Sequence, residues 1–374
     1  MCFPLVSRFL TLLYLPIAST HLLHHNPLLD NTRLSNLEKG ELRMFENINI
    51  LYLAHYAPDE AGKYHEFDNL HKVYADYHRK IYDILSNNCR NVKTSNDPQI
   101  MFNIPDGINY IFSLYNRMPF RNSEIFISSV AEYHKISYLG ARPNIRALAE
   151  DKHLSKMMAA YANVPTPKWE IYSIDNKTEE PSFKGPYFIK PRFGAASKYI
   201  DENSICDTWS DAKSRIEYLY AQQQDVIVEQ FIDGIYYTSP VLNNFNNYLF
   251  LPCVQEISEL KGNIVTYRQK RKVDGGLYRE VVFDSSINTK IQSHSKKMFQ
   301  LVQPLDYTRF DYIVSKKDSI PYFIEFNVCC NLGEHSTLSQ AAKSLGYTYE
   351  ETILNILASS LYRNGLITDK SHHF

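Results

Sequence analysis

Two apolar runs near the C-terminal end carry polar residues at alternate positions. The first opens with Arg309 and Asp311, and the second ends with Glu325 and Asn327. Because alternate residues of an extended strand share a face, the members of each pair point the same way. If the runs pair as a hairpin across the turn 316–319, two carboxylates, an amide and a guanidinium lie on one patch.

This patch has two interpretations. Its oxygen atoms suit Mg²⁺, or Mn²⁺ in its place, because such a cation takes one or two carboxylates and fills its other positions from substrate phosphates. The alternative is a solvated hairpin face with an ordinary ion pair. The metal site would be formed by Asp311, Glu325 and Asn327.

Length and composition describe a globular protein larger than a single core. The 374 residues are 44% hydrophobic and 22% charged, which predicts two or three packed subdomains. A net charge of -1 gives no general attraction for nucleic acid or anionic membranes. The six cysteines lack zinc-like spacing, and we interpret them as reduced thiols.

The first 43 residues stand apart from this pattern. An apolar stretch at 9–18 follows the single Arg8, which resembles a weak signal peptide but is too short to span a bilayer. The alternative is a start at Met44, because an apolar strand begins at Ile48. We prefer the second interpretation, and with it a cytoplasmic protein.

The next hundred residues alternate between strand and helix patterns. Such alternation predicts a small parallel α/β layer. Ser123 is expected to cap a helix, with Glu124 just inside it. The expected elements are strand 48–53, helix 67–85, strand 110–115, helix 124–133 and strand 136–139.

Beyond a long helix expected at 145–161, strand patterns dominate and predict an antiparallel α+β region. Pro165 and Pro167 force extended backbone after that helix. Thr337 and Gln340 suggest a capping box for a helix that Gly346 ends, and a last helix is expected at 349–362. The expected strands are 187–190, 226–231, 236–242, 248–257, 264–269, 310–314 and 322–326.

Two further stretches suit a nucleotide. Lys190 ends an apolar strand and precedes a loop of small residues, 193–198, whose backbone N–H groups can approach a phosphate closely. The strand 226–231 ends with Glu229 before Gly234, where an exposed backbone edge can pair with adenine and the carboxylate can accept its exocyclic amine. Each stretch alone is also compatible with an ordinary turn or strand end.

Taken in order over residues 138–357, these features resemble the ATP-grasp superfamily, and within it the D-alanine–D-alanine ligase-like branch of carboxylate–amine ligases. Only weak similarity extends back through residues 44–137. The motifs that carry the resemblance are Leu139-Gly140-Ala141, Asp151-Lys152, Val164-Pro165-Thr166-Pro167, Ile189-Lys190-Pro191, Val228-Glu229-Gln230, Arg309-Phe310-Asp311, Glu325-Phe326-Asn327 and His335-Ser336-Thr337-Leu338.

The resemblance implies an ATP-grasp fold and a set of roles for residues. Arg309 would stabilise the transferring phosphoryl group, Lys270 would contact phosphate, and Ser336 would hold the carboxylate of the second substrate at a helix start. The residues implied in ATP binding are Lys152, Lys190, Ser197, Glu229, Gln230, Phe231 and Ile232.

It also implies boundaries between subdomains. They are an N-terminal extension 1–43, a first α/β subdomain 44–142, a central subdomain 143–228 with the lid loop, and a C-terminal subdomain 229–374 with the metal site.

The chain departs from the branch at four places. The lid loop 193–197 lacks the common Glu-Gly-Ser-Ser, and Tyr236 stands where a second acid would grip the ribose, for which Asp233 is the alternative. The segment 328–333 is one residue longer than the branch pattern. Residues 116–124 replace a Gly-Glu-Asp-Gly signature, and their arginines, Arg117 and Arg121, either grip a substrate carboxylate or are simply exposed.

These parts predict an ATP-dependent ligase that activates a carboxylate as an acyl phosphate, joins it to an amine and releases ADP and phosphate. The substrates would be small amino acids or peptides, and the protein a monomer or homodimer. The alternatives are an ATP-grasp kinase and an inactive ATP-binding regulatory module.

Overall fold

The computed structural model describes residues 45–368 except 46, 60–62, 64–67, 116–117, 119–122, 175–177 and 284. The chain divides into two units, 1–37 and 38–374, and all described residues belong to the second. The expectations for the segment 1–43, the start at Met44, and Arg117 and Arg121 lie outside the described residues.

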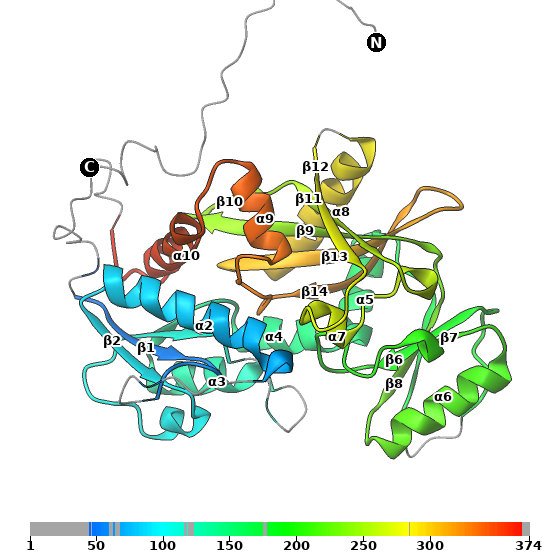
Figure 1. Cartoon of the computed structure of the whole chain (residues 1–374), viewed down its shortest axis with the longest axis horizontal. Coiled ribbons are helices and arrows are strands. Elements are labelled where there is room, and N and C mark those ends of the chain that lie inside the picture. Colours follow the sequence, from blue (N-terminus) through cyan, green and yellow to red (C-terminus); the bar gives the residue numbers. More distant parts are fainter. Residues whose placement is uncertain are drawn as a thin grey trace, which may run out of the picture. The chain divides into compact units, whose positions relative to one another are not determined.

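The first sheet is parallel and confirms the predicted α/β layer (Figure 1). Its strands run in the order β2-β1-β3-β4, all of them parallel. Apolar side chains of β1 and β3 lie at 0% exposure, as expected for strands covered on both faces. The elements are β1 Asn49–Leu53, α2 Asn69–Asn88, β2 Asn91–Ser95, η2 Pro98–Phe102, β3 Tyr110–Ser113, α3 Ile125–His134 and β4 Ser137–Tyr138.

Two helices, α4 Pro143–Glu150 and α5 Lys152–Tyr161, lead to a smaller antiparallel sheet. Its order is β5-β8-β6-β7, and α6 covers it over a buried apolar cluster that includes Ile189, Ile216 and Val228. The elements are β5 Trp169–Tyr172, β6 Tyr187–Pro191, η3 Glu202–Ser204, β7 Ile205–Cys206, α6 Trp209–Ala221 and β8 Val226–Gln230.

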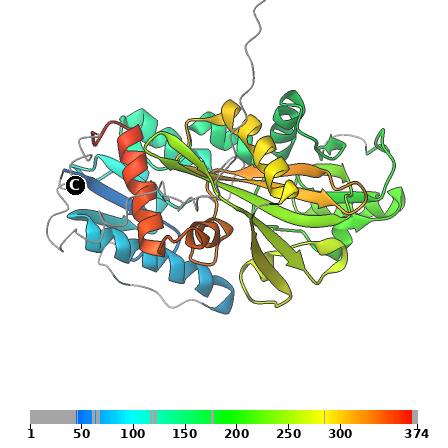
Figure 2. The same cartoon turned by 90° about the horizontal axis from the view of Figure 1, so that it is seen from above.

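The largest sheet is antiparallel, in the order β12-β11-β9-β13-β14, with β10 paired to β9. Helix α8 crosses it in both views (Figure 2), and Met298 and Phe299 of α8 share a buried core with Phe310 and Tyr312. The strands are β9 Gly234–Asn244, β10 Asn247–Phe250, β11 Cys253–Ser258, β12 Leu277–Val282, β13 Tyr307–Ser315 and β14 Pro321–Asn327. The helices are η4 Lys261–Asn263, α7 Tyr267–Lys270, α8 Ser286–Val302, α9 Thr337–Ser344 and α10 Tyr349–Arg363.

The predicted hairpin is present as β13 and β14. Arg309 lies opposite Asn327, and Asp311 lies opposite Glu325. The pairing then shifts between Asp311 and Tyr312, because Tyr312 pairs with Phe323 and leaves Ile324 as an extra residue on β14. Such a bulge bends the strand locally.

The structure corrects three expected elements. Residues 264–269 were expected to form a strand, but α7 begins at Tyr267, because Thr266 and Gln269 form a reciprocal capping box that satisfies the first N–H groups of a helix. The helix expected at 145–161 is two helices, because Asp151 has extended backbone and caps α5 through His153 N. The strand expected at 248–257 is likewise divided into β10 and β11.

Two expected caps also differ. Helix α3 begins after Glu124 without a side-chain cap, so the capping role expected of Ser123 is wrong. Helix α9 is capped by Ser336, whose Oγ accepts from Ser339 N at 3.1 Å. The capping box expected from Thr337 and Gln340 is therefore wrong, because the N-cap is Ser336, one residue before Thr337.

Candidate active site

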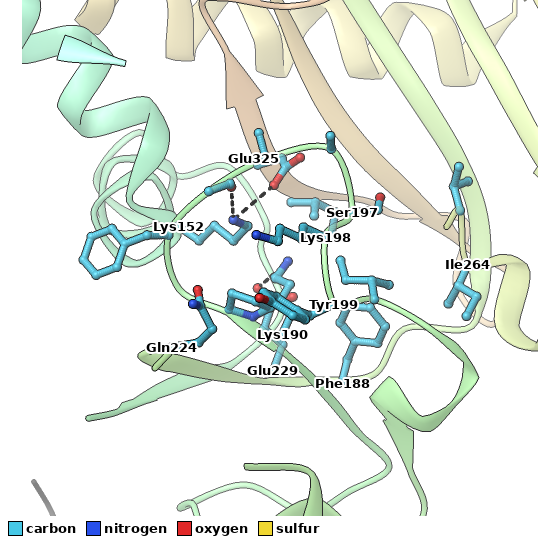
Figure 3. A pocket seen from close by; sticks show the side chains of 18 of the residues that line it. Lys152, Phe188, Lys190, Ser197, Lys198, Tyr199, Gln224, Glu229, Ile264 and Glu325 are labelled. Carbon is cyan, nitrogen blue, oxygen red and sulfur yellow. Dashed lines mark hydrogen bonds and ion pairs between the residues drawn. The ribbon is translucent and has the colours of Figure 1, made fainter. Parts of the chain in front are cut away.

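A cavity of about 620 Å³ lies between the smaller antiparallel sheet and the edge of the largest one (Figure 3). This volume is that of a typical small-molecule site. Its apolar part includes Phe188, Phe231, Ile264 and Ile324. The polar residues that line it include Lys152, Lys190, Ser197, Glu229, Gln230, Lys270 and Glu325.

Lys152 enters this cavity from the first turn of α5. Its Nζ donates to the carbonyl of Gly194 at 2.6 Å and lies 4.0 Å from Glu325 Oε2 (Figure 3). Burial lowers the pKa of Lys152, and the negative charge of Glu325 opposes that shift. The ammonium therefore connects the lid loop to the hairpin.

Glu229 faces the same cavity from β8 but is already bound to two cations. Its Oε1 lies 2.9 Å from Lys190 Nζ and 3.1 Å from Lys156 Nζ, and all three side chains are at most 3% exposed. Burial alone would raise the pKa of Glu229, but Lys156 and Lys190 lower it overall. The expected acceptance of an adenine amine by this carboxylate competes with both lysines.

The backbone after β8 offers a better contact for a base. The N–H groups of Gln230 and Phe231 donate to Lys168 and Pro186. In the part of the chain that the structure describes, Ile232 N–H has no such partner, although Ile232 lines the cavity. This free donor beside apolar walls suits the edge of a purine.

The hairpin patch reaches this cavity through Glu325. Asp311 is fully buried, and its Oδ2 accepts from Arg309 Nη2 and from Asn327 Nδ2, each at 3.0 Å. Burial raises the pKa of Asp311 to about 6, with Arg309 acting in the opposite direction. The pKa of Glu325 is lowered overall. Burial by itself would raise it, but the positive charges of Lys152, Lys190 and Lys270 outweigh that effect.

A second cavity, of about 350 Å³, adjoins the first. Lys270 and Glu325 line both cavities, as do Glu124 and the lid residues Ala195 and Ala196. Arg309, Asn327 and Ser336 line the second cavity alone. Two adjoining cavities with a shared charged wall can hold a nucleotide and a second substrate next to each other.

The hairpin donors fit a magnesium ion. They are carboxylate and amide oxygens, the ligands that a hard cation prefers, although Asp311 Oδ1 already forms an ion pair with Arg309 Nε at 2.9 Å. The described residues contain no group of three or more His, Cys, Asp or Glu that could hold a metal. Two carboxylates and an amide would therefore need phosphate oxygens or water to complete a coordination shell.

Comparisons with known proteins agree with this geometry. Residues 157–358 match the family model described as the C-terminal part of D-ala D-ala ligase. The D-alanine–D-alanine ligase B of Clostridium perfringens is 30% identical over 231 residues, which are 60% of this chain and 72% of that protein. The chain belongs to the D-alanine–D-alanine ligase family.

Further relatives support the family. The D-alanine–D-alanine ligase of Maridesulfovibrio salexigens is 27% identical over 224 residues, 59% of this chain and 70% of that protein. The crystal structure of the Bacillus anthracis D-alanine–D-alanine ligase complexed with ATP superposes with a TM-score of 0.66 at 17% identity, covering 85% of this chain and 99% of that one. The predicted ATP-grasp fold and the class of ATP-dependent carboxylate–amine ligase are confirmed.

The ligase brings the residues chosen from its sequence into one region. Every residue expected to bind ATP lines the first cavity, and Lys270, Arg309, Glu325, Asn327 and Ser336 line the second. Asp311, the fully buried member of the patch, lines neither cavity. The roles of these residues stay predictions.

Sequence reasoning missed three charged residues of the site. Lys156 lies one helical turn after Lys152, and this spacing was its only signal. Glu256 is 2% exposed and pairs with Arg279 at 2.6 Å on neighbouring strands. That pair depends on the register of β11 and β12, which the sequence did not reveal.

In the described residues, no helix is long and apolar enough to cross a membrane.

Proposed function

We propose that the ligase uses ATP to phosphorylate a substrate carboxylate in the space between its two cavities and then joins the acyl group to an amine, releasing ADP and phosphate. The observation that carries the proposal is the shared wall, in which Lys270 and Glu325 line the nucleotide cavity and the second cavity together. A phosphoryl group at this wall is within reach of a substrate on the other side.

Cations surround the point where phosphate would transfer. Lys152, Lys190 and Lys270 all lower the pKa of Glu325 through their charges, so they lie close enough to act on an anion there. Bound Mg²⁺, held by Asp311, Glu325 and Asn327, would neutralise part of the charge on the phosphate oxygens. The lysines and Arg309 would orient the γ-phosphate for in-line attack, which needs electrostatics and no protein nucleophile.

Arg309 is well placed to act on developing charge. It is only 15% exposed, and its Nη2 donates to Asp311 at 3.0 Å. The guanidinium is therefore held in a fixed orientation while its edge faces the second cavity. Such a fixed donor stabilises charge without reorganisation during the reaction.

The substrates that we infer are small amino acids, with D-alanine tested first because the relatives are D-alanine–D-alanine ligases. Ser336 caps α9 and lines the second cavity, which suits a substrate carboxylate because the helix start favours negative charge. We place the reaction in the cytoplasm, where ATP and free amino acids are available, and treat the active form as a monomer or homodimer.

Isotope transfer tests the mechanism. Purified protein is given ATP, Mg²⁺ and D-alanine, or each other amino acid in turn, with ¹⁸O in the carboxylate. An acyl phosphate transfers one labelled oxygen to the released phosphate, and ADP forms only when the amino acid is present. AMP as product, or unlabelled phosphate with accumulating dipeptide, would falsify the mechanism. A stable phosphorylated product without an amide would indicate a kinase.

A further inference from the structure

Helix α7 supplies Lys270 to the wall between the two cavities, yet it has only four residues, Tyr267–Lys270. A helix this short is not stable by itself, because few backbone hydrogen bonds offset the entropy of ordering it. Its N-terminal end is held by the capping box of Thr266 and Gln269. The position of Lys270 at the other end requires a further restraint.

Arg271 directly follows Lys270 and has an unusual environment. It is 3% exposed. Its guanidinium carbon lies 3.7 Å from the ring centre of Tyr267 on α7 and 4.4 Å from that of Tyr74 on α2. Within the described part of the chain, neither Nε nor Nη1 has a hydrogen-bond partner.

A buried guanidinium in which two nitrogens lack hydrogen-bond partners is unfavourable unless another interaction compensates it. Two tyrosine rings provide that compensation, because the cation–π attraction is strongest when the cation is shielded from water. Tyr74 belongs to the helix after β1, whereas Tyr267 follows β11 of the largest sheet. Arg271 therefore joins two parts of the fold that are distant in the sequence (Figure 1).

The joint lies at the second cavity. Tyr74 lines this cavity, as do Lys270 and Lys272 on either side of Arg271. The neighbour Arg268 differs, because it is on the same helix but its side chain is 58% exposed and pairs with Asp274 at 2.9 Å. Only one of these two arginines is placed to fix the end of α7.

We propose that Arg271 is a positioning residue that clamps α7 against α2 through Tyr267 and Tyr74 and so holds Lys270 in the wall shared by the two cavities. Arg271 itself contacts neither substrate. The kinetic part of its test rests on the proposed function, whereas its structural part does not.

The structural test is hydrogen exchange on the full chain. In Arg271→Gln, the amides of residues 266–273 should exchange at least tenfold faster than in the wild type, while those of β13 stay unchanged. Tyr74→Leu should have the same effect, and Tyr74→Phe, which keeps the ring, should not. The matched control Arg268→Gln should leave exchange at 266–273 near the wild-type rate. Unchanged exchange in Arg271→Gln and Tyr74→Leu would overturn the clamp.

The kinetic test asks whether the clamp acts through Lys270. With D-alanine and ATP, Arg271→Gln should lower kcat by roughly tenfold to thirtyfold, the equivalent of about one desolvated cation–π contact. The KM for ATP should change by less than about threefold, since the effect is on the reacting state. Arg271→Lys should recover part of the rate, and Arg268→Gln should behave as the wild type.

A double-mutant cycle separates positioning from a general structural effect. In the Lys270→Gln background, Arg271→Gln should cause little further loss, because its effect passes through the missing lysine. A full additional loss would overturn the positioning role even if the exchange data show the clamp. If the wild type turns over no amino acid, the proposed function fails, and hydrogen exchange still decides whether the clamp exists.

Discussion

Glu229→Gln is the change whose effect can be worked out most fully. Glu229 Oε1 lies 2.9 Å from Lys190 Nζ and 3.1 Å from Lys156 Nζ, and Lys156 is fully buried. Glutamine keeps the shape of the side chain and removes the charge. Breaking a buried ion pair in this way typically costs about 3–5 kcal/mol of unfolding free energy.

The pH dependence of that cost has a definite sign. Burial lowers the pKa of Lys156 to about 8, and without Glu229 it falls further. Near pH 7 Lys156 of the variant can therefore release its proton on folding instead of staying charged and unpaired. The part of the lost unfolding free energy that comes from Lys156 is then limited to roughly 1.4 kcal/mol, because its pKa in the wild type lies about one unit above pH 7. We expect a total loss of about 3–4 kcal/mol at pH 7, since water in the cavity can solvate Lys190 in part.

Acidification should increase the loss. Between pH 7 and pH 6 unfolded Lys156 is protonated in both proteins, whereas folded Lys156 is mostly protonated in the wild type, where its pKa is about 8, and less so in the variant, where its pKa is lower. The unfolded variant thus binds more protons than the folded one, so its stability falls as the pH falls, by up to about 1.4 kcal/mol per pH unit. Lys156 adds only a small slope to the wild type in that window, because the folded protein already keeps most of this proton.

Urea unfolding at pH 6, 7 and 8 measures these differences, provided that the m-values agree. The matched control is Glu170→Gln on the neighbouring strand β5, where the carboxylate accepts two exposed hydrogen bonds from Ser182. Its loss should stay below about 1 kcal/mol at every pH. The reasoning is refuted if Glu229→Gln matches this control, or if its loss does not change with pH.

Three other predictions concern the metal site, the N-terminus and the packing of β9. Asp311→Ala and Glu325→Ala should each abolish ADP release while leaving far-UV circular dichroism unchanged, because each removes an oxygen ligand; normal turnover in both would contradict the metal site. A protein that starts at Met44 should match the full chain in Tm and ADP release, and its failure to fold would show that residues 1–43 are needed. Gly234→Ala should lower the unfolding free energy by about 1–3 kcal/mol, since the new Cβ would lie 2.3 Å from Val314 O, whereas Gly275→Ala meets nothing within 4 Å and should be nearly neutral in the same urea titration.

The hairpin was predictable because its pattern is local. Alternation placed Arg309 with Asp311 and Glu325 with Asn327, and the short turn between the two runs favoured a hairpin. The register at the patch was not predictable in this way, because the pairing next to the turn would place Asp311 opposite Ile324, and the bulge moves it opposite Glu325. The order of motifs then predicted the family.

The errors arose where one local signal competed with another. Ile264 and Val265 resemble a strand, but Thr266 and Gln269 cap a helix three residues later. The helix-forming run at 145–161 conceals the break at Asp151, whose side chain caps the next helix. In both cases a side-chain cap, which the hydrophobic pattern does not show, determined where the helix begins.

The missed charges could not be predicted locally. Lys156 looks like a solvent-facing helix residue until β8 places Glu229 against it, and Arg271 looks like one more basic residue until α2 places Tyr74 beside it. Both depend on contacts between residues far apart in the sequence. A single sequence gives no signal for such contacts.

The bulge in β14 has a consequence for what one strand can contribute. In a regular strand, neighbouring residues face opposite sides, yet Ile324 and Glu325 both line the nucleotide cavity. The extra residue lets β14 direct an apolar side chain and a carboxylate into the same cavity, and in the proposed function these would face the base and the phosphates of ATP. Deleting Ile324 would give a more regular hairpin and, by the same geometry, a strand β14 that no longer directs two adjacent side chains into this cavity.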